Sequence, residues 1–165
     1  MTGAAGQSSG RAPPADFDFI IGDWTVQHRR LQARLTGCTT WDEFPGEMST
    51  RKVMGGWGNI EDNVLDMPGG AYRAVALRAF CAQGQTWSIW WLDGRNPMQI
   101  DTPVVGIFRD HIGLFEAKDL IDGRPTLVRF TWTATPDANP HWAQAFSIDG
   151  GASWETNWTM EFIRR

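Results

Sequence analysis

The stretch that decides the fold is "WETNWTMEFIR", residues 154–164. In an extended strand, successive side chains point to opposite faces of the sheet. One predicted face of this segment carries Trp154, Thr156, Trp158, Met160 and Phe162. The other face carries Glu155, Asn157, Thr159 and Glu161. A dry face opposite a wet face is typical of an antiparallel strand that lies against a core on one side.

The same alternation recurs from Trp24 onward, with β-branched and aromatic residues interrupted by Gly, Pro, Asp and Asn. It predicts ten strands, over residues 24–35, 47–54, 58–66, 71–80, 86–92, 104–109, 113–121, 126–134, 141–148 and 154–164. No segment reads as an amphipathic helix of convincing length. Because open sheet edges invite aggregation, so many antiparallel strands must close or stack. We therefore expect an all-β fold, a single antiparallel β-barrel of about 8–10 strands with a short N-terminal helical turn.

The chain of 165 residues is long enough for one domain. Small residues dominate "MTGAAGQSSGRAPPA", so we expect a flexible tail over residues 1–15 and a barrel domain over residues 16–165. The start lacks the basic and apolar regions of a signal peptide, and no long apolar run follows. These features predict a cytoplasmic protein with no membrane partner. The net charge of −4 argues against a nucleic-acid partner.

One motif invites a specific function. The segment "SIDGGASW", residues 147–154, fits the pattern Ser-x-Asp-x-Gly-x-Ser-Trp and resembles the Asp-box of sialidases and other β-propellers. A propeller repeats its blades, whereas this motif occurs once. We therefore expect a hairpin in which Asp149 accepts hydrogen bonds from the turn and Trp154 packs over the corner.

The usual signs of metal, cofactor or nucleophilic chemistry are missing. The three histidines lack the spacing of a metal site, and there is no phosphate-binding, dinucleotide-binding or Gly-x-Ser-x-Gly motif. His141 is one alternative, as a haem ligand like that of the nitrobindins, but no motif of that family surrounds it. Cys38 and Cys81 are expected to be free, buried thiols. The sequence thus predicts no metal and no cofactor, and leaves any catalytic residue unknown.

The whole chain resembles a known barrel family. Gly22-Asp23-Trp24 opens the first long strand, and Arg164-Arg165 ends the last one. This layout is similar to the calycin or lipocalin signature, in which an Arg packs on the ring of a Trp. The stretches "FDFIIGDWTVQHRRL", "GNIEDN", "WSIWWLDGR" and "WAQAFSIDGGASWETNWTMEFIR" look like an uncharacterised bacterial domain-of-unknown-function family with a calycin-like barrel. The resemblance implies the fold and an inward Trp24, but no activity.

If Trp24 points inward, so do His28 and Arg30, because they share its face of the strand. A polar pair among aromatic rings could anchor a ligand. The alternatives are that both side chains face water at the barrel mouth, or that Arg30 forms a structural ion pair. The candidate ligand-binding set is Trp24, His28, Arg30, Trp90, Trp132 and Trp158.

Three functions are compatible with these patterns. The first is binding of a small hydrophobic or aromatic molecule in an aromatic-lined cavity. The second is an enzyme of isomerase, cyclase or hydratase type, which needs His28 buried beside a carboxylate such as Asp62. The third is a homodimeric interaction module with a solid interior. It would use the two-sided apolar segment "TWSIWWLD", residues 86–93, whose outer face is otherwise covered by the N-terminal turn.

Overall fold

The computed structural model of the chain describes residues 10–165, so most of the tail predicted over residues 1–15 lies outside the described part. The strands are β1 (Gly22–Leu31), β2 (Trp41–Val53), β3 (Gly58–Leu65), β4 (Tyr72–Cys81), β5 (Thr86–Asp93), β6 (Val104–Arg109), β7 (Ile112–Ile121), β8 (Arg124–Thr133), β9 (His141–Ser147) and β10 (Glu155–Arg164). Two short 3₁₀ helices, η1 (Asp18–Ile20) and η2 (Met54–Gly56), complete the described elements. Neither helix is long and apolar enough to cross a membrane.

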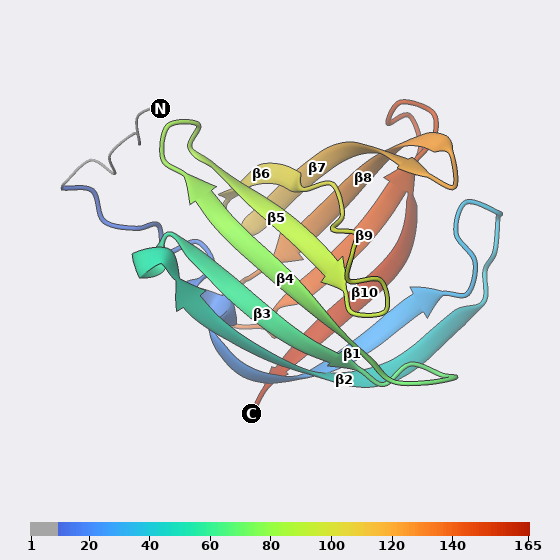
Figure 1. Cartoon of the computed structure of the whole chain (residues 1–165), viewed down its shortest axis with the longest axis horizontal. Coiled ribbons are helices and arrows are strands. Elements are labelled where there is room, and N and C mark those ends of the chain that lie inside the picture. Colours follow the sequence, from blue (N-terminus) through green and yellow to red (C-terminus); the bar gives the residue numbers. More distant parts are fainter. Residues whose placement is uncertain (1–9) are drawn as a thin grey trace.

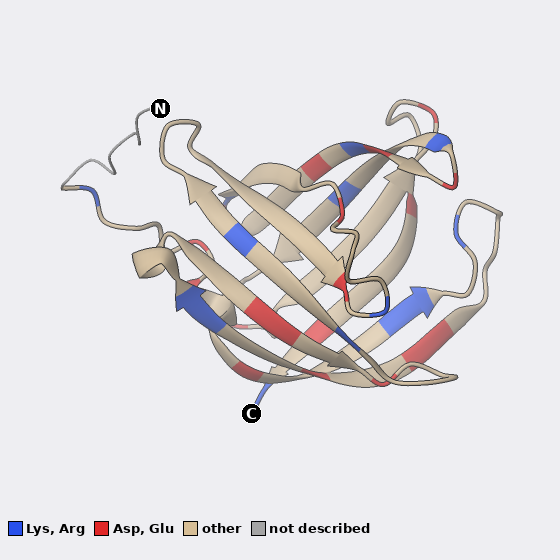
Figure 2. Cartoon of the chain, viewed as in Figure 1, with Lys and Arg blue, Asp and Glu red and all other residues tan. Residues whose placement is uncertain are grey.

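The ten strands form one closed antiparallel barrel, which confirms the predicted fold class (Figure 1). Each strand pairs with its neighbours in the chain, and β1 closes the ring by pairing with β10. Closure gives every strand a paired neighbour on each side, so the sheet has no free edge strand. Charged residues of both signs are distributed over the strands and loops (Figure 2).

The predicted N-terminal helical turn is present as η1, and this turn closes one end of the barrel. Phe17 and Ile20 are fully buried there. The Phe17 ring meets the rings of Trp87, Phe115 and Trp132 at centroid distances of 5.0, 5.9 and 6.0 Å. The turn therefore enters the barrel and does not cover the outer face of β5, which corrects that alternative.

The first and last strands are locked together at this closed end. Trp24 Nε1 donates a hydrogen bond to the carbonyl of Ile20 at 2.8 Å. The guanidinium of Arg164 lies 4.1 Å from the centroid of the Trp24 ring and donates to the carbonyls of Ile21 and Phe19, each at 3.0 Å. The expected packing of an arginine from the end of the last strand on the Trp24 ring is therefore present.

A β-bulge corrects the predicted face assignment within residues 154–164. The register between β9 and β10 shifts between Thr156 and Trp158, which pair with Ala145 and Gln144. The extra residue is Asn157, which reverses the alternation that precedes it. Trp158 therefore faces the interior as expected, whereas Trp154 lies on the outside with Arg129 stacked 3.7 Å from its ring centroid.

The interior also holds a polar cluster that the sequence analysis did not identify. Arg78 on β4 and Glu61 on β3 form an ion pair with side chains only 2% and 3% exposed. Arg78 Nη1 donates to Asn59 Oδ1 at 2.8 Å, and Asn63 Nδ2 donates to Glu61 Oε1 at 3.1 Å. The Arg78 guanidinium also stacks 5.0 Å from the Phe17 ring centroid. The cluster therefore links the barrel wall to the N-terminal segment that closes this end of the barrel.

The Asp-box motif forms the predicted hairpin turn between β9 and β10. Asp149 Oδ1 accepts hydrogen bonds from the backbone of Ser153 and the hydroxyl of Ser147, at 2.9 and 2.8 Å. The hydrogen bonds from Ser153 and Ser147 lower the pKa of Asp149 to about 2. Trp154 Nε1 donates to the carbonyl of Gly151 at 3.1 Å, so each polar group of the motif serves the turn itself.

The outside of the barrel carries exposed apolar residues on β6 and β7. Val105, Ile112 and Leu114 are each about two-fifths exposed, at 42%, 40% and 44%. The homodimer expected from an apolar outer face stays a prediction.

Both cysteines are free, but the expectation of burial is wrong, since Cys81 is exposed and Cys38 only half-buried.

Candidate functional site

A cavity of about 230 Å³ opens at the end of the barrel opposite the N-terminal turn. Six strands and two loops contribute its lining. The lining residues are Arg30, Arg34, Tyr72, Trp91, Asp93, Arg95, Asp101, Phe130, Trp142, Gln144, Trp158 and Met160. The cavity exceeds the ~150 Å³ hollow that accommodates a benzene molecule. Its size therefore suits a ligand of one or two rings.

Three tryptophans form the apolar wall. The ring of Trp158 lies edge-on to Trp91 at a centroid distance of 5.7 Å and edge-on to Trp142 at 5.5 Å. Edge-to-face contacts of this kind are the favourable arrangement for aromatic pairs. Phe130 packs in the same manner against Trp142, at 4.9 Å. The rings hold one another in place, so the wall is formed before any ligand enters.

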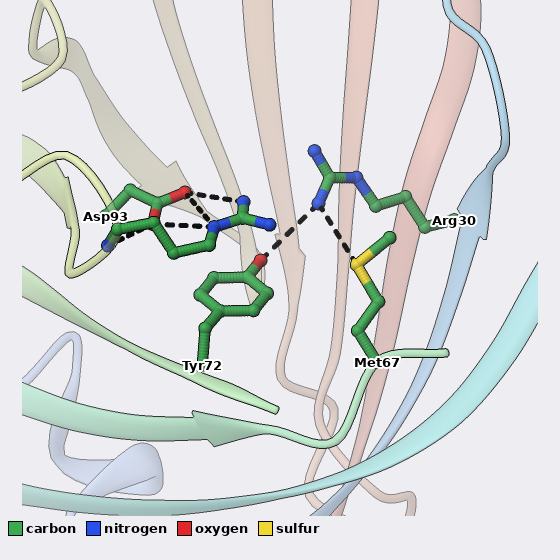
Figure 3. A network of polar contacts seen from close by, with 5 residues as sticks. Arg30, Met67, Tyr72 and Asp93 are labelled. Carbon is green, nitrogen blue, oxygen red and sulfur yellow. Dashed lines mark hydrogen bonds and ion pairs between the residues drawn. The ribbon is translucent and has the colours of Figure 1, made fainter. Parts of the chain in front are cut away.

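The second wall is a chain of polar contacts (Figure 3). Asp93 and Arg95 form a forked pair, with the closest contact 2.7 Å from Arg95 Nη2 to Asp93 Oδ2. The Arg95 guanidinium stacks on Tyr72, 3.7 Å from the ring centroid. Arg30 Nη1 donates to the hydroxyl of Tyr72 at 3.4 Å, and the two side chains point toward one another in Figure 3. Arg30 also stacks 4.7 Å from the Trp158 ring centroid, which joins the two walls.

The connection between β1 and β2 contributes Arg34 at the mouth. The backbone N–H of Leu35 donates to both carboxylate oxygens of Glu155, at 2.9 and 3.0 Å. Arg124 Nη1 donates to the Leu35 carbonyl at 3.5 Å. These contacts tie the loop to the start of β10 and the start of β8. Arg34 stacks over the Phe146 ring at 5.4 Å.

The ionisable groups of the cavity are perturbed in directions that follow from their neighbours. Burial raises the pKa of Tyr72, so its hydroxyl keeps its proton. Hydrogen bonds from Arg95 lower the pKa of Asp93. Loss of hydration, and then the charges of Asp119 and Asp93, raise the pKa of Asp101. Burial, and then the positive charge of Arg30, lower the pKa of Arg34.

His28 lies fully buried behind the aromatic wall and does not line the cavity. Its Nδ1 accepts a hydrogen bond from Trp158 Nε1 at 3.2 Å, and its ring stacks on Phe44 at 4.8 Å. Burial, and then the charge of Arg30, lower its pKa to about 4. A neutral ring that accepts at Nδ1 carries its proton on Nε2. His28 therefore holds Trp158 in position.

The other five residues predicted from the sequence are divided between three places. Arg30 and Trp158 meet in the cavity. Trp24 and Trp132 are buried at the closed end, where Trp132 stacks on Phe162 at 5.2 Å. Trp90 occupies the outer face, because it alternates with the cavity-lining Trp91.

The structure does not place a carboxylate beside His28 in the way the enzyme hypothesis requires. Asp62 pairs with Arg73 at 2.7 Å, and both side chains are more than half exposed on the outer face. His141, the alternative haem ligand, is exposed at the start of β9. No cluster of three or more potential metal-ligating side chains occurs within residues 10–165.

The sequence did not identify six polar residues of the cavity, namely Arg34, Tyr72, Asp93, Arg95, Asp101 and Gln144. Four of them, Tyr72, Asp93, Arg95 and Asp101, lie at the start of β4, at the end of β5 and in the loop over residues 94–103, where alternation carries no information. The chain holds a single tyrosine among its many aromatic residues, and this was the one available signal.

Together the fold and the site define a closed β-barrel with an aromatic and arginine-lined cavity at one end. A scan against protein-family models finds no match to the chain, and a search of the curated proteins finds none either.

Proposed function

We propose that the protein binds a small hydrophobic or aromatic molecule in the cavity at the open end of the barrel. The observation that carries this proposal is the wall formed by Trp91, Trp142 and Trp158. These rings are fixed by contacts among themselves, yet they border a cavity of about 230 Å³. Apolar cavities with a few convergent polar groups are the usual form of a small-molecule site. The stacking of Arg164 on Trp24 supports a calycin-like protein, a class whose barrels often hold ligands.

Adjacent tryptophans on β5 provide the test. Trp91 lines the cavity, whereas Trp90 lies on the outer face. Isothermal titration calorimetry with a panel of one-ring and two-ring aromatic compounds should reveal binding at one site per chain. Trp91→Leu should weaken that binding, and Trp90→Leu should leave it unchanged. Equal loss of affinity in both variants, or a panel in which no compound binds, would refute the proposal.

A further inference from the structure

The cavity has an excess of positive charge. Its lining includes the guanidiniums of Arg30, Arg34 and Arg95 and the carboxylates of Asp93 and Asp101. Three cations against two anions leave one positive charge when all are ionised. Asp93 is already engaged by the forked contact with Arg95. The excess therefore falls on Arg30 and Arg34.

Neither of these two arginines has a carboxylate within ion-pair distance among residues 10–165. Arg30 contacts neutral groups, the Tyr72 hydroxyl at 3.4 Å and the Met67 sulfur at 4.0 Å. Arg34 loses hydration at the mouth and is repelled by Arg30, and these two effects outweigh the charges of Asp122, Asp101 and Glu155, so that the pKa of Arg34 is lowered. Half-buried charges without a partner are costly, and one anion between them would relieve both.

The geometry around Arg30 suits a particular anion. Its guanidinium carbon lies over the Trp158 ring, 4.7 Å from the ring centroid, and its Nη1 points at the Tyr72 hydroxyl. A guanidinium can donate two parallel hydrogen bonds to a carboxylate, and a protonated tyrosine can donate a third. The tryptophan wall begins at the same ring, so an aromatic body attached to the carboxylate would contact Trp158 and Trp142.

We propose, building on the binding function above, that the ligand is a monocarboxylate on one or two fused aromatic rings. Its carboxylate binds between Arg30 and Arg34, beside Tyr72, and its ring lies against the tryptophan wall. The single negative charge matches the single positive excess. The cavity volume of about 230 Å³ exceeds the roughly 150 Å³ hollow that holds one benzene ring, so it has room for a second fused ring.

The test compares naphthalene-2-carboxylate with its neutral carboxamide by titration calorimetry of the full chain at pH 7.5. Charge-assisted hydrogen bonds of this kind should make the acid bind at least about tenfold more tightly than the amide. Arg30→Gln should remove most of that preference. Arg29→Gln is the matched control, because Arg29 is the next residue on β1 and pairs with Glu43 on the outer face. It should preserve the preference.

The outcomes separate this inference from the function on which it rests. Equal affinity for the acid and the amide would overturn the carboxylate proposal and leave aromatic binding intact. No binding of either compound, nor of the wider aromatic panel, would overturn both. If Arg30→Gln does not fold, Arg34→Gln decides, because Arg34 lies in the loop after β1 and belongs to no strand. An unchanged preference in a folded Arg34→Gln variant would refute the paired-arginine site.

Discussion

Removing the guanidinium of Arg78 should destabilise the barrel far more than removing an equivalent surface charge. Arg78→Met keeps most of the side-chain volume but leaves the Glu61 carboxylate buried at 3% exposure. Among residues 10–165, the side-chain donor that remains to it is the Asn63 amide, at 3.1 Å. The side-chain oxygen of Asn59, Oδ1, also loses the 2.8 Å hydrogen bond that Arg78 Nη1 donates.

Breaking a buried ion pair by deleting one partner costs about 3–5 kcal/mol, because the other charge stays uncompensated. We expect Arg78→Met to lower the free energy of unfolding by that amount. Adding Glu61→Gln removes the stranded charge and keeps a side chain that can bond to Asn63. The double variant should therefore recover about 2 kcal/mol relative to Arg78→Met alone.

Urea denaturation at pH 7.5, followed by near-ultraviolet circular dichroism, measures each free energy. Arg73→Met is the matched control, because Arg73 also joins β4 to β3 but pairs with Asp62 in exposed positions. Exposed pairs of this kind contribute no more than about 1 kcal/mol. If Arg78→Met costs no more than Arg73→Met, or if the double variant is no more stable than Arg78→Met, the reasoning from a buried, charged pair is refuted.

Three further predictions concern stability measured in the same way. The pKa of His28 is about 4 in the folded state and 6.5 in the unfolded chain, so unfolding takes up a proton at pH values below 6.5. Stability should therefore be full above that pH and fall by about 3 kcal/mol towards pH 4; an equally steep fall in His28→Gln would contradict this. Gly46→Ala would place a Cβ 2.5 Å from His28 Nε2 and should cost about 1–3 kcal/mol. The more open Gly84→Ala serves as its control, and equal costs would remove the argument. Arg164→Ala deletes two hydrogen bonds and the stacking on Trp24, and should lower the free energy of unfolding by about 2–3 kcal/mol. The adjacent Arg165→Ala removes one exposed ion pair, to Glu47, and should change stability by less than about 0.5 kcal/mol; similar losses in the two variants would argue against a stabilising role for the Arg164 contacts.

Much of the barrel could be predicted from the sequence because strand alternation is a local property. The ten strands, the Asp-box hairpin and the N-terminal turn each follow from a few neighbouring residues. Their bounds shift at the ends, as where the second strand begins at Trp41 and not near residue 47, because pairing with a neighbour extends a strand beyond its own pattern.

The candidate site was predictable only in part. Arg30 and Trp158 were identified, because each lies on a strand with one clear face. On β5 both faces are apolar, so the pattern could not decide between Trp90 and Trp91. The bulge at Asn157 reversed the alternation before it, and no local signal marks that extra residue.

The sequence alone thus determined the strands, the closed barrel and the supply of aromatic rings and arginines. The tertiary structure decided which of them meet. Trp158 and His28 are 130 positions apart in the chain, yet they share a hydrogen bond because β1 and β10 pair to close the ring. Alternation fixes which residues of one strand share a face, whereas register, bulges and closure fix which strands bring those faces together.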